Sequence, residues 1–521
     1  MQHADGDQVD AVRAGSPSIA GSGQPARRPS AAALLVAGVL FVTGTGTAAL
    51  TAGLSDPAAG PAQLGRPSSA AGGGREGAAP SSSATGATVD EPAGVGAAAT
   101  GAAAAGDEAP ENAPDPSVAL ARAAAVQPLL TARSAAVRSG GRAAWLRLLD
   151  PEATAFRARQ GAVLDRVRRL APTAWSYELV GTATAAGTPG VPAFLAHVRL
   201  HYRLSADTRD VVREQYLDVV QRSGRWYLAG DGDPRTEPAL WDLGELRVWR
   251  GRRSLVVGIG LPAGPATDAR LRRIAGVTDA AAGDVDAVWG VGWPRAAVVV
   301  VPRTRALMAR ALGRADDDGL DQVAAVTSGE LDRASEAGPP SSAPLPRPGG
   351  VADRVVLNPD PFARLTEVGR RVVLTHELTH VATRASARPA VPLWVEEGFA
   401  NYVAYRTSRL APAVVASDVL PAVRSGTAPE HLPVAADFDP SSGPIAAAYA
   451  DAWLAFDLMS RGGASRPLDF YRHAAGRGGG ADRSADDLVT AAFRDVLGTT
   501  QEQFEANWRA YRAQLAAGTA A

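Results

Sequence analysis

The first marked feature in the pattern of apolar and polar positions is an uncharged run from Ala31 to Leu54. About 20 apolar residues suffice to cross a bilayer, so this run predicts a single membrane-spanning helix. Arg27 and Arg28 precede it and Asp56 follows it, which by the positive-inside tendency places the N-terminus in the cytoplasm and the remainder outside the cell. A cleaved signal peptide, with secretion of the rest of the chain, is the alternative.

Two polar stretches of low complexity flank this run. Residues 1–30 are rich in Gly and Pro, and residues 55–115 are almost entirely Ala, Gly, Ser, Pro and Thr with scattered acids. Such compositions lack the aromatic and branched side chains that offset the entropy of ordering. The sequence therefore predicts a disordered cytoplasmic tail followed, after the span, by a flexible linker.

Periodic patterning begins near Pro116 and indicates a small α+β domain over residues 116–235. Apolar residues recur at helical spacing in Val118–Leu149, and a second helical stretch covers Pro151–Leu170. Alternation of apolar and polar residues then predicts strands at the following segments: Ala193–Tyr202, Val211–Val220 and Arg225–Leu228. Ser223 and Gly224 stand where a tight hairpin needs a glycine.

A second α+β domain is predicted over residues 240–518, with a sheet followed by helices. Its expected strands are these: Leu246–Val257, Ala296–Pro302 and Gln322–Thr327. A helix is expected near Asp268–Ala275, and the apolar run Val372–Thr383 is typical of a buried helix. The Gly/Pro/Ser stretch 337–350 is the expected mobile loop.

Composition narrows the classes of function. A length of 521 residues suggests about three structural units. The 53 basic residues, all arginine, balance 54 acids to a net charge of −1, which argues against nucleic-acid binding. The high content of Gly (55 residues) and Pro (38 residues) is typical of proteins encoded by GC-rich bacterial genes. The chain has no cysteine, which excludes disulfides, thiolate zinc sites, iron–sulfur clusters and cysteine nucleophiles. Any transition-metal site must therefore use His and carboxylate ligands.

The strongest chemical signal is the string His376-Glu377-Leu-Thr-His380 inside the predicted buried helix. On a helix His376 and His380 lie on one face, one turn apart, so both imidazoles can reach the same metal ion. Glu377 projects beside them, where it can take a proton from water without being a ligand. A catalytic zinc usually has three protein ligands, so a third is expected downstream.

The downstream string Leu393-Trp-Val-Glu396-Glu397-Gly-Phe-Ala-Asn-Tyr402 resembles the second motif of the gluzincin metallopeptidases. The resemblance is to the branch that includes the aminopeptidase N type and the peptidase MA-like proteins. It implies a thermolysin-like fold, with a zinc helix packed on an N-terminal sheet and helices after it, and Glu397 as the third zinc ligand. Glu396 is expected to be an acid in solvent or beside a ligand rather than a ligand itself.

Two departures from the family and one further match concern the substrate. The spacer between the two motifs is slightly shorter than is typical of the aminopeptidases. The chain has no G-x-M-E-N string, the motif by which the aminopeptidases recognise a free amino terminus, so the resemblance favours an endopeptidase. The segment Arg354–Asn358 resembles the edge strand along which gluzincins align an extended peptide by main-chain hydrogen bonds.

In the family, a tyrosine or histidine after the second motif donates a hydrogen bond to the oxyanion. Tyr449 matches this pattern in the helix predicted over Ile445–Met459, and a tyrosine simply packed at a helix start is the alternative. His431, in a Pro-rich loop, is a weaker candidate. The stretch Gly498–Tyr511 resembles the family's terminal helix and is expected to serve packing.

The smaller domain, with helices before a sheet that ends in Gly224-Arg-Trp-Tyr-Leu-Ala-Gly-Asp-Gly-Asp233, resembles NTF2-like or cystatin-like domains. His197 and His201 share one face of a predicted strand and are expected to be sheet-surface residues rather than ligands. No catalytic constellation occurs here, so we expect a spacer or a binding module.

Together these features predict a membrane-anchored, extracytoplasmic zinc metallopeptidase that hydrolyses peptides or proteins of the surface or envelope. The alternative is a non-catalytic cell-surface binding protein, in which the NTF2-like domain holds a ligand and the peptidase domain is a degenerate scaffold. The intact set of His376, Glu377, His380 and Glu397 favours the enzyme, because degeneracy usually removes a ligand.

Overall fold

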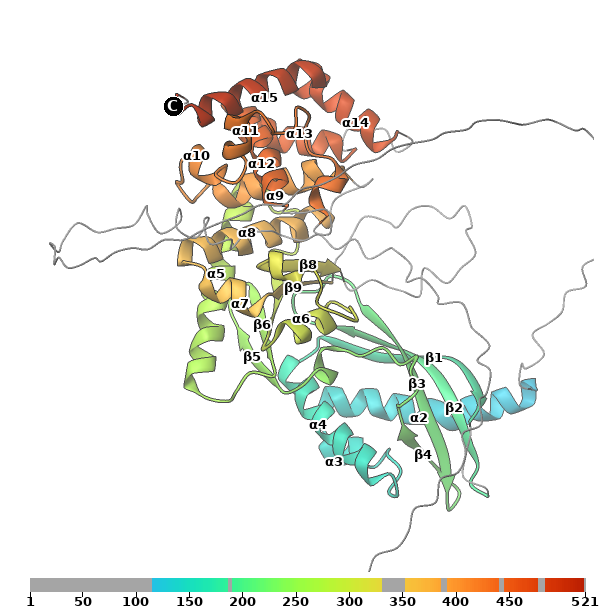
Figure 1. The fold of residues 1–521 in the computed structure, drawn as a ribbon. Helices are drawn as coiled ribbons and strands as arrows, with labels where there is room; N and C mark the ends of the chain where they lie inside the picture. The colour runs from blue at the N-terminus through green and yellow to red at the C-terminus, as the bar shows by residue number, and fades with distance from the viewer. Residues whose placement is uncertain are drawn as a thin grey trace, which may run out of the picture. The chain divides into compact units, whose positions relative to one another are not determined.

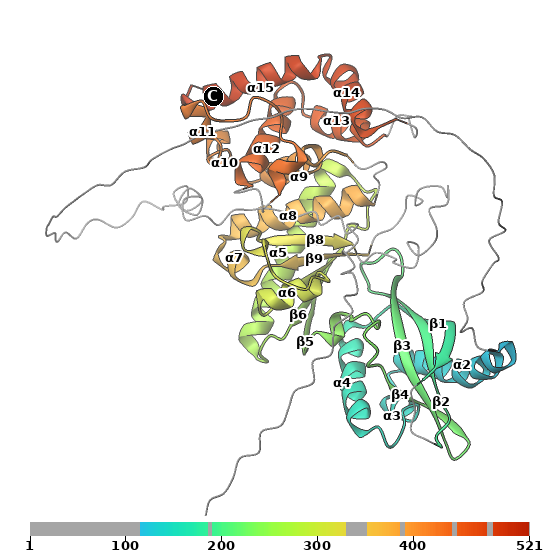
Figure 2. The same cartoon turned by 45° about the vertical axis from the view of Figure 1, so that its right-hand side comes forward.

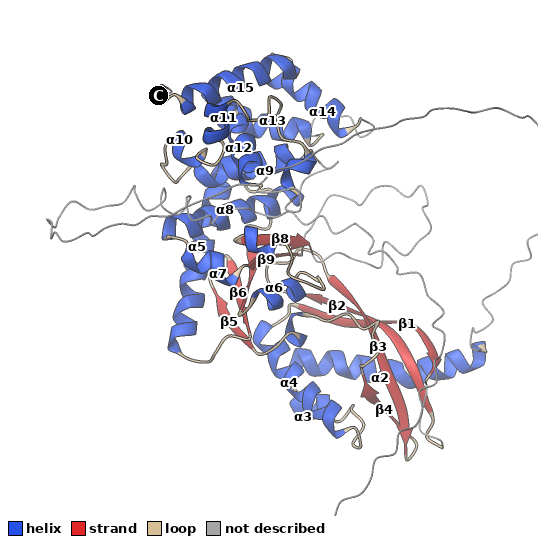
Figure 3. Cartoon of the chain, in the orientation of Figure 1, coloured by secondary structure: helices blue, strands red, loops and turns tan. Residues whose placement is uncertain are grey.

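The computed structural model describes residues 115–185, 190–329, 352–385, 391–439, 445–476 and 483–519. These residues form an α+β structure with a four-stranded and a five-stranded sheet (Figures 1 and 3). The chain divides into two compact units, residues 1–34 and residues 35–521, and only the second contains described residues.

The single-span membrane anchor expected from the sequence is corrected. Within the described ranges, no helix combines the length and the apolar character that crossing a bilayer requires. The run 31–54 itself lies outside the described residues, as do the tail 1–30, the linker 55–114 and the loop 337–350. The expected fold with a membrane helix, the cell-membrane localisation and the envelope substrates that depended on it are therefore withdrawn.

The first sheet is an antiparallel meander preceded by helices. Its elements are α2 (Pro116–Ser139), α3 (Arg142–Leu146), α4 (Thr154–Leu170), β1 (Ala174–Thr184), β2 (Ala193–Arg203), β3 (Val211–Arg222) and β4 (Arg225–Gly230). Each strand pairs antiparallel with the next. Ser223 and Gly224 join β3 to β4 with φ of 48° and 77°, the left-handed values that a two-residue hairpin requires. The helix expected over 118–149 ends instead at Gly140, whose φ of 69° caps α2 before α3 begins.

Alternation along β2 separates the two faces of this sheet. The even-numbered residues from Phe194 to Tyr202 are buried, and the odd-numbered residues from Ala193 to Arg203 are partly exposed. His197 and His201 belong to the exposed set and contact the carboxylates of Glu214 and Glu178 at 2.5 and 3.1 Å. They lie on the sheet surface, as expected from a strand with period two.

The second sheet is mixed. Its strands are β5 (Leu246–Arg250), β6 (Ser254–Ile259), β7 (Ala297–Pro302), β8 (Ala325–Gly329) and β9 (Asp353–Leu357), in the order β5-β6-β7-β9-β8. The strands β6, β7 and β9 run parallel, whereas β5 and β8 pair antiparallel at the two edges. Burial on both faces explains the near-continuous valine runs in the parallel strands.

The edge strand beside the helix that carries His376 and His380 differs from the expected one. The segment Arg354–Asn358 forms β9, which lies between β7 and β8, so it cannot offer a free edge. The edge is β8, which pairs with β9 in a register that sets Thr327 opposite Val355. Strand order depends on pairing between segments that are distant in sequence, and periodicity within one strand carries no signal of it.

Two long helices pack against each other beside this sheet, namely α5 (Pro265–Trp289) and α8 (Glu367–Arg384) (Figure 2). Helix α5 extends well beyond the helix expected near Asp268–Ala275. The continuation was not expected, because the residues after Ala275 are mainly Ala, Gly and Asp and their apolar stripe is weak. An ion pair fixes their contact: Arg371 donates twice to Asp284, at 2.7 Å each.

The remaining helical elements complete the second half of the chain. They are η1 (Leu240–Asp242), α6 (Arg305–Ala311), η2 (Leu320–Gln322), α7 (Pro359–Arg364), α9 (Leu393–Tyr405), α10 (Pro412–Val415), α11 (Leu420–Ser425), η4 (Ala435–Phe438), α12 (Ala446–Arg461), α13 (Arg466–Ala474), α14 (Ala485–Ala492), η6 (Phe493–Leu497, a π-helical turn) and α15 (Gln501–Ala516). The helix expected over Ile445–Met459 corresponds to α12, and the expected terminal helix to α15.

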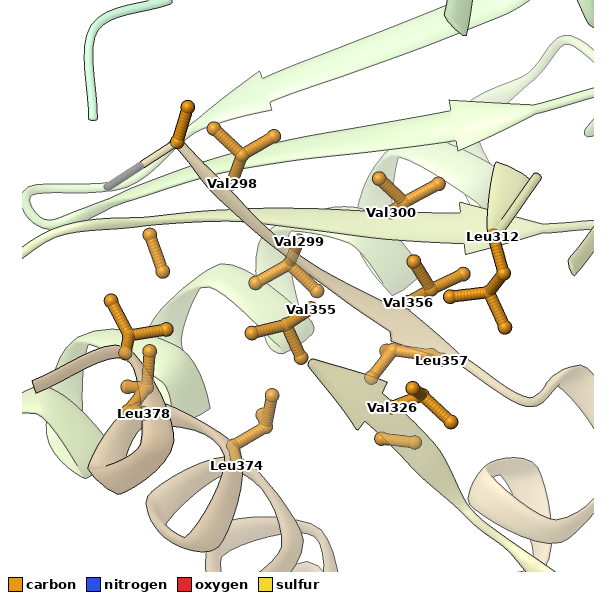
Figure 4. Packing of buried hydrophobic residues seen from close by; sticks show 14 of the residues in the cluster. Val298, Val299, Val300, Leu312, Val326, Val355, Val356, Leu357, Leu374 and Leu378 are labelled. Atoms are coloured by element: carbon orange, nitrogen blue, oxygen red, sulfur yellow. The ribbon is translucent and has the colours of Figure 1, made fainter. Parts of the chain in front are cut away.

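Helix α8 packs on the sheet with one face and directs its two histidines toward α9 with the opposite face. Leu374 and Leu378, four residues apart, point toward Val299 and Val355 of the sheet (Figure 4). His376 and His380 follow each of these leucines by two residues, which on a helix is a rotation of about 200°. The imidazoles are therefore directed away from the sheet and toward α9, while the leucines anchor the helix.

Close packing of α9 on α12 depends on Gly398. A Cβ at this position would lie 2.6 Å from the Ala452 carbonyl oxygen and 2.7 Å from Phe456 Cδ2. The absence of a side chain thus lets the two backbones approach, which brings Tyr449 of α12 close to Glu397 of α9.

We expect Gly398→Ala to destabilise the protein by about 1–3 kcal/mol through overpacking, despite the better helix propensity of alanine. Gly283→Ala is the matched control, because Gly283 is an exposed residue within α5 and a Cβ there meets nothing within 4 Å. The control should be neutral or up to about 1 kcal/mol more stable. Urea unfolding measures both, and equal stabilities would contradict the close contact.

Candidate metal centre

Three side chains from α8 and α9 converge on one point. The Nε2 atoms of His376 and His380 are 2.9 Å apart, and Glu397 Oε2 lies 3.2 Å from the first and 3.5 Å from the second. All three residues are at least 97 % buried. The two residues of the helical i, i+4 pair and the downstream acid are thus brought together as the sequence predicts.

The size of this triangle fits a small tetrahedral cation. With zinc–ligand distances of about 2.0–2.1 Å, two ligand atoms of a tetrahedral site are separated by about 3.3 Å. The three observed separations, 2.9, 3.2 and 3.5 Å, bracket that value. In addition, Glu397 Oε2 accepts no well-formed hydrogen bond from the described part of the chain. A buried carboxylate oxygen without a donor is costly, and a cation at this point would satisfy it.

Neighbouring polar groups orient the two imidazoles. His376 Nδ1 donates to Asn401 Oδ1 at 2.8 Å, which leaves Nε2 with its lone pair facing Glu397. Asn401 follows Glu397 by one helical turn, so both project from the same face of α9. On the other imidazole, Glu396 Oε1 lies 3.5 Å from His380 Nδ1. Glu396 is therefore beside a ligand rather than in the ligand triangle.

Glu377 is held next to this group by the edge strand. Thr327 of β8 donates its hydroxyl to Glu377 Oε2 at 2.6 Å. Within the described residues the other oxygen, Oε1, has no hydrogen-bond partner, although the side chain is fully buried. Burial raises the pKa of Glu377 above its usual value, against the opposing effects of His376, His380 and Thr327. The result is a carboxylate that is oriented at one oxygen and available at the other.

The buried charges favour a cation. Burial alone would lower the pKa of His380, but the carboxylates of Glu397 and Glu396 outweigh it and raise that pKa to about 10. For Glu397, burial alone would raise the pKa, but the two imidazoles lower it by more than burial raises it. The net pKa is below the usual value, so the carboxylate stays ionised. Three glutamates therefore surround two imidazoles in a site with little water. Without a metal the balancing charge is a proton on His380, and a divalent cation can replace it.

Tyr449 lies beside the group and His431 does not contact it. The Tyr449 ring is 5 % exposed, and its centre is 6.5 Å from that of His376. Burial and the nearby carboxylates raise the pKa of its phenol well above the usual value, so it remains a proton donor. His431 is exposed, with Nδ1 2.9 Å from the carbonyl oxygen of Leu432.

Sequence reasoning did not identify the two supporting residues, Thr327 and Asn401. Asn401 could have been found, because its spacing of four from Glu397 on a predicted helix puts both on one face. Thr327 is fifty residues from Glu377, and the hydrogen bond between them depends on the position of β8 at the sheet edge. The sequence pattern of a short buried strand does not indicate which of its residues will contact a helix fifty residues away.

Comparisons with known proteins provide no family for this chain: no family model matches it, and neither a curated protein nor a solved structure shows significant similarity.

Proposed function

We propose that the chain is a zinc-dependent peptidase of the gluzincin type, and most simply an endopeptidase. The observation that carries the proposal is the buried triangle of His376, His380 and Glu397, whose ligand atoms all lie within 4.8 Å of one another. Its support is the donor chemistry, the separation of the ligand atoms and the excess of buried carboxylates. The resemblance of the two sequence motifs to gluzincins adds the reaction class.

The roles of the residues follow from their positions. His376, His380 and Glu397 would hold the zinc ion, which when bound supplies a Lewis acid for the scissile carbonyl and lowers the pKa of a water molecule. Glu377 Oε1 is placed to take a proton from the attacking water and to pass it to the leaving amine. Thr327 keeps the other carboxylate oxygen in place. Tyr449 is positioned to donate a hydrogen bond to the negative charge that develops on the carbonyl oxygen.

We assign substrate alignment to β8 rather than β9. Among the described strands none pairs with the outer side of β8, and its last residues, Ser328 and Gly329, are partly exposed. An extended peptide can add to such an edge through main-chain hydrogen bonds. Thr327 belongs to the same strand, so a peptide bound there would pass close to Glu377.

The test is hydrolysis of an unstructured protein and of a peptide blocked at both ends, using the full-length chain. We expect internal cleavage of both substrates, loss of activity with a zinc chelator, and recovery when zinc is added back. Cleavage that is insensitive to the chelator would refute the zinc mechanism. Cleavage only of peptides with a free terminus would refute the endopeptidase assignment and leave the metal site standing.

Asn401→Ala should weaken zinc binding by about 10- to 100-fold, because His376 then loses the acceptor that fixes its ring orientation and tautomer. Asn401→Asp retains an acceptor oxygen at that position and should stay within a few fold of wild type. Competition with a fluorescent zinc chelator measures both variants. If Asn401→Ala binds zinc as tightly as wild type, this hydrogen bond does not support the site.

A further inference from the structure

A second site candidate is a cavity lined by residues of α2, α3 and α4 and by one face of the first sheet. The cavity has a volume of about 390 Å³, within the range of about 300–1,000 Å³ typical of small-molecule sites. Its walls include four aromatic side chains and two polar ones: Trp145, Trp175, Tyr177, Trp241, Arg133 and Gln215. We call this space the aromatic cavity.

Arg133 is the charged group of the aromatic cavity and is only partly satisfied. The residue is 4 % exposed, and its guanidinium lies 3.8 Å from the ring centre of Trp145. Its Nε donates to the hydroxyl of Tyr177 at 3.0 Å, and its Nη2 donates to Gln160 Oε1 at 2.7 Å. Its Nη1 has no hydrogen-bond partner in the described part of the chain. A buried cationic N–H without an acceptor is costly, so the domain maintains this group at an energetic disadvantage.

Two further polar atoms in the wall are also without partners among the described residues. One is Nε1 of Trp175, a residue that is 5 % exposed, and the other is the buried amide oxygen Oε1 of Gln215. The aromatic cavity thus offers two donors, one of them charged, and one acceptor. Trp175 and Trp241 lie with ring centres 5.1 Å apart and form an apolar surface next to these atoms.

The acids that line the aromatic cavity are paired with other groups, although the charge of Arg133 acts on Asp242 and partly offsets the rise that burial causes in its pKa. Asp231 contacts Arg159 and accepts from Gln160, Asp233 accepts from Arg235, Asp242 accepts from the Ala239 amide, and Glu237 lies 3.8 Å from Arg213. Among the described residues no carboxylate lies within ion-pair distance of Arg133. The guanidinium of Arg133 is therefore the group in this cavity that could bind an anion from solution.

We propose that the aromatic cavity binds a small organic carboxylate with a flat apolar body. The carboxylate accepts from Arg133 Nη1, the flat body lies against the tryptophan rings, and a hydroxyl or N–H of the ligand donates to Gln215 Oε1. The proposal is independent of the zinc site, because none of its residues belongs to α8, α9 or α12.

Isothermal titration calorimetry of the full-length protein tests this with indole-3-acetate, which combines a flat ring, an N–H and a carboxylate. Its neutral counterpart, indole-3-acetamide, has nearly the same shape. We expect saturable binding with one site per chain, roughly 10- to 100-fold tighter for the carboxylate than for the amide, because the hydrogen bond to Arg133 is charge-assisted only with the former.

Arg133→Gln should abolish this preference, since it removes the charge and keeps a donor. Arg147→Gln, the same change at an exposed position in the same domain, should leave binding unchanged. Circular dichroism and melting temperature report whether Arg133→Gln is folded, and the comparison of the two ligands on wild type needs no variant. The proposal is wrong if neither ligand saturates, if both bind equally well, or if folded Arg133→Gln still prefers the carboxylate.

Discussion

Glu377→Gln should lower peptidase activity by several orders of magnitude while leaving zinc binding intact. Glutamine keeps the shape of the side chain and can still accept from Thr327, whose hydroxyl lies 2.6 Å from Glu377 Oε2. It cannot accept a proton, however, so the general base is lost. Loss of a positioned base typically costs about 10²- to 10⁴-fold in rate. We expect at least that reduction in kcat/KM.

The matched control is Glu367→Gln, the same change in the exposed first turn of the same helix. It should retain full activity. Initial rates on a fluorogenic peptide, with zinc content measured on the same samples, separate loss of the base from loss of the metal. Equal turnover by wild type and Glu377→Gln would contradict the proposed mechanism.

His380→Ala should reduce zinc affinity by about three orders of magnitude or more. The zinc site would have only three protein ligands, and a bound structural zinc is worth about 10–16 kcal/mol in all, so each ligand contributes several kcal/mol. The substitution also leaves Glu396 and Glu397 buried beside one imidazole only, so the metal-free protein should lose stability as well. Activity should fall with the zinc content.

His201→Ala is the control for this change. His201 pairs with Glu178 on the surface of the first sheet, and no third ligand is near it among the groups that could hold a metal in the described residues. Chelator competition should give His201→Ala the affinity of wild type. If His380→Ala retains a full equivalent of tightly bound zinc, the ligand assignment is wrong.

Local patterns in the sequence predicted most individual elements. The alternation in Ala193–Tyr202 and the Ser223-Gly224 pair identified β2 and the hairpin after β3, because each signal is contained in one short stretch of the chain. Spacing on a helix likewise predicted that His376 and His380 face one point. The resemblance to a known motif, rather than spacing, supplied Glu397, and the structure brings it within 3.5 Å of both imidazoles.

The failures concern relations between distant segments. The order of β9 and β8 is set by pairing across the sheet, so the edge strand was assigned to the wrong segment. The hydrogen bond from Thr327 to Glu377 follows from the same order. The aromatic cavity requires α2, the first sheet and η1 to assemble around Arg133, and no short motif reports it. The membrane helix predicted at 31–54 is a separate case, because it rests on a local signal, the length of the uncharged run and its flanking charges. No helix of the described residues is long and apolar enough to span a membrane.

The central claim is that His376, His380 and Glu397 form a zinc site, and the metal content of the purified full-length protein tests it most directly. Inductively coupled plasma mass spectrometry after dialysis against a weak chelator should find one zinc per chain. Less than about a tenth of an equivalent, in protein that is folded and has been exposed to zinc, would contradict the account.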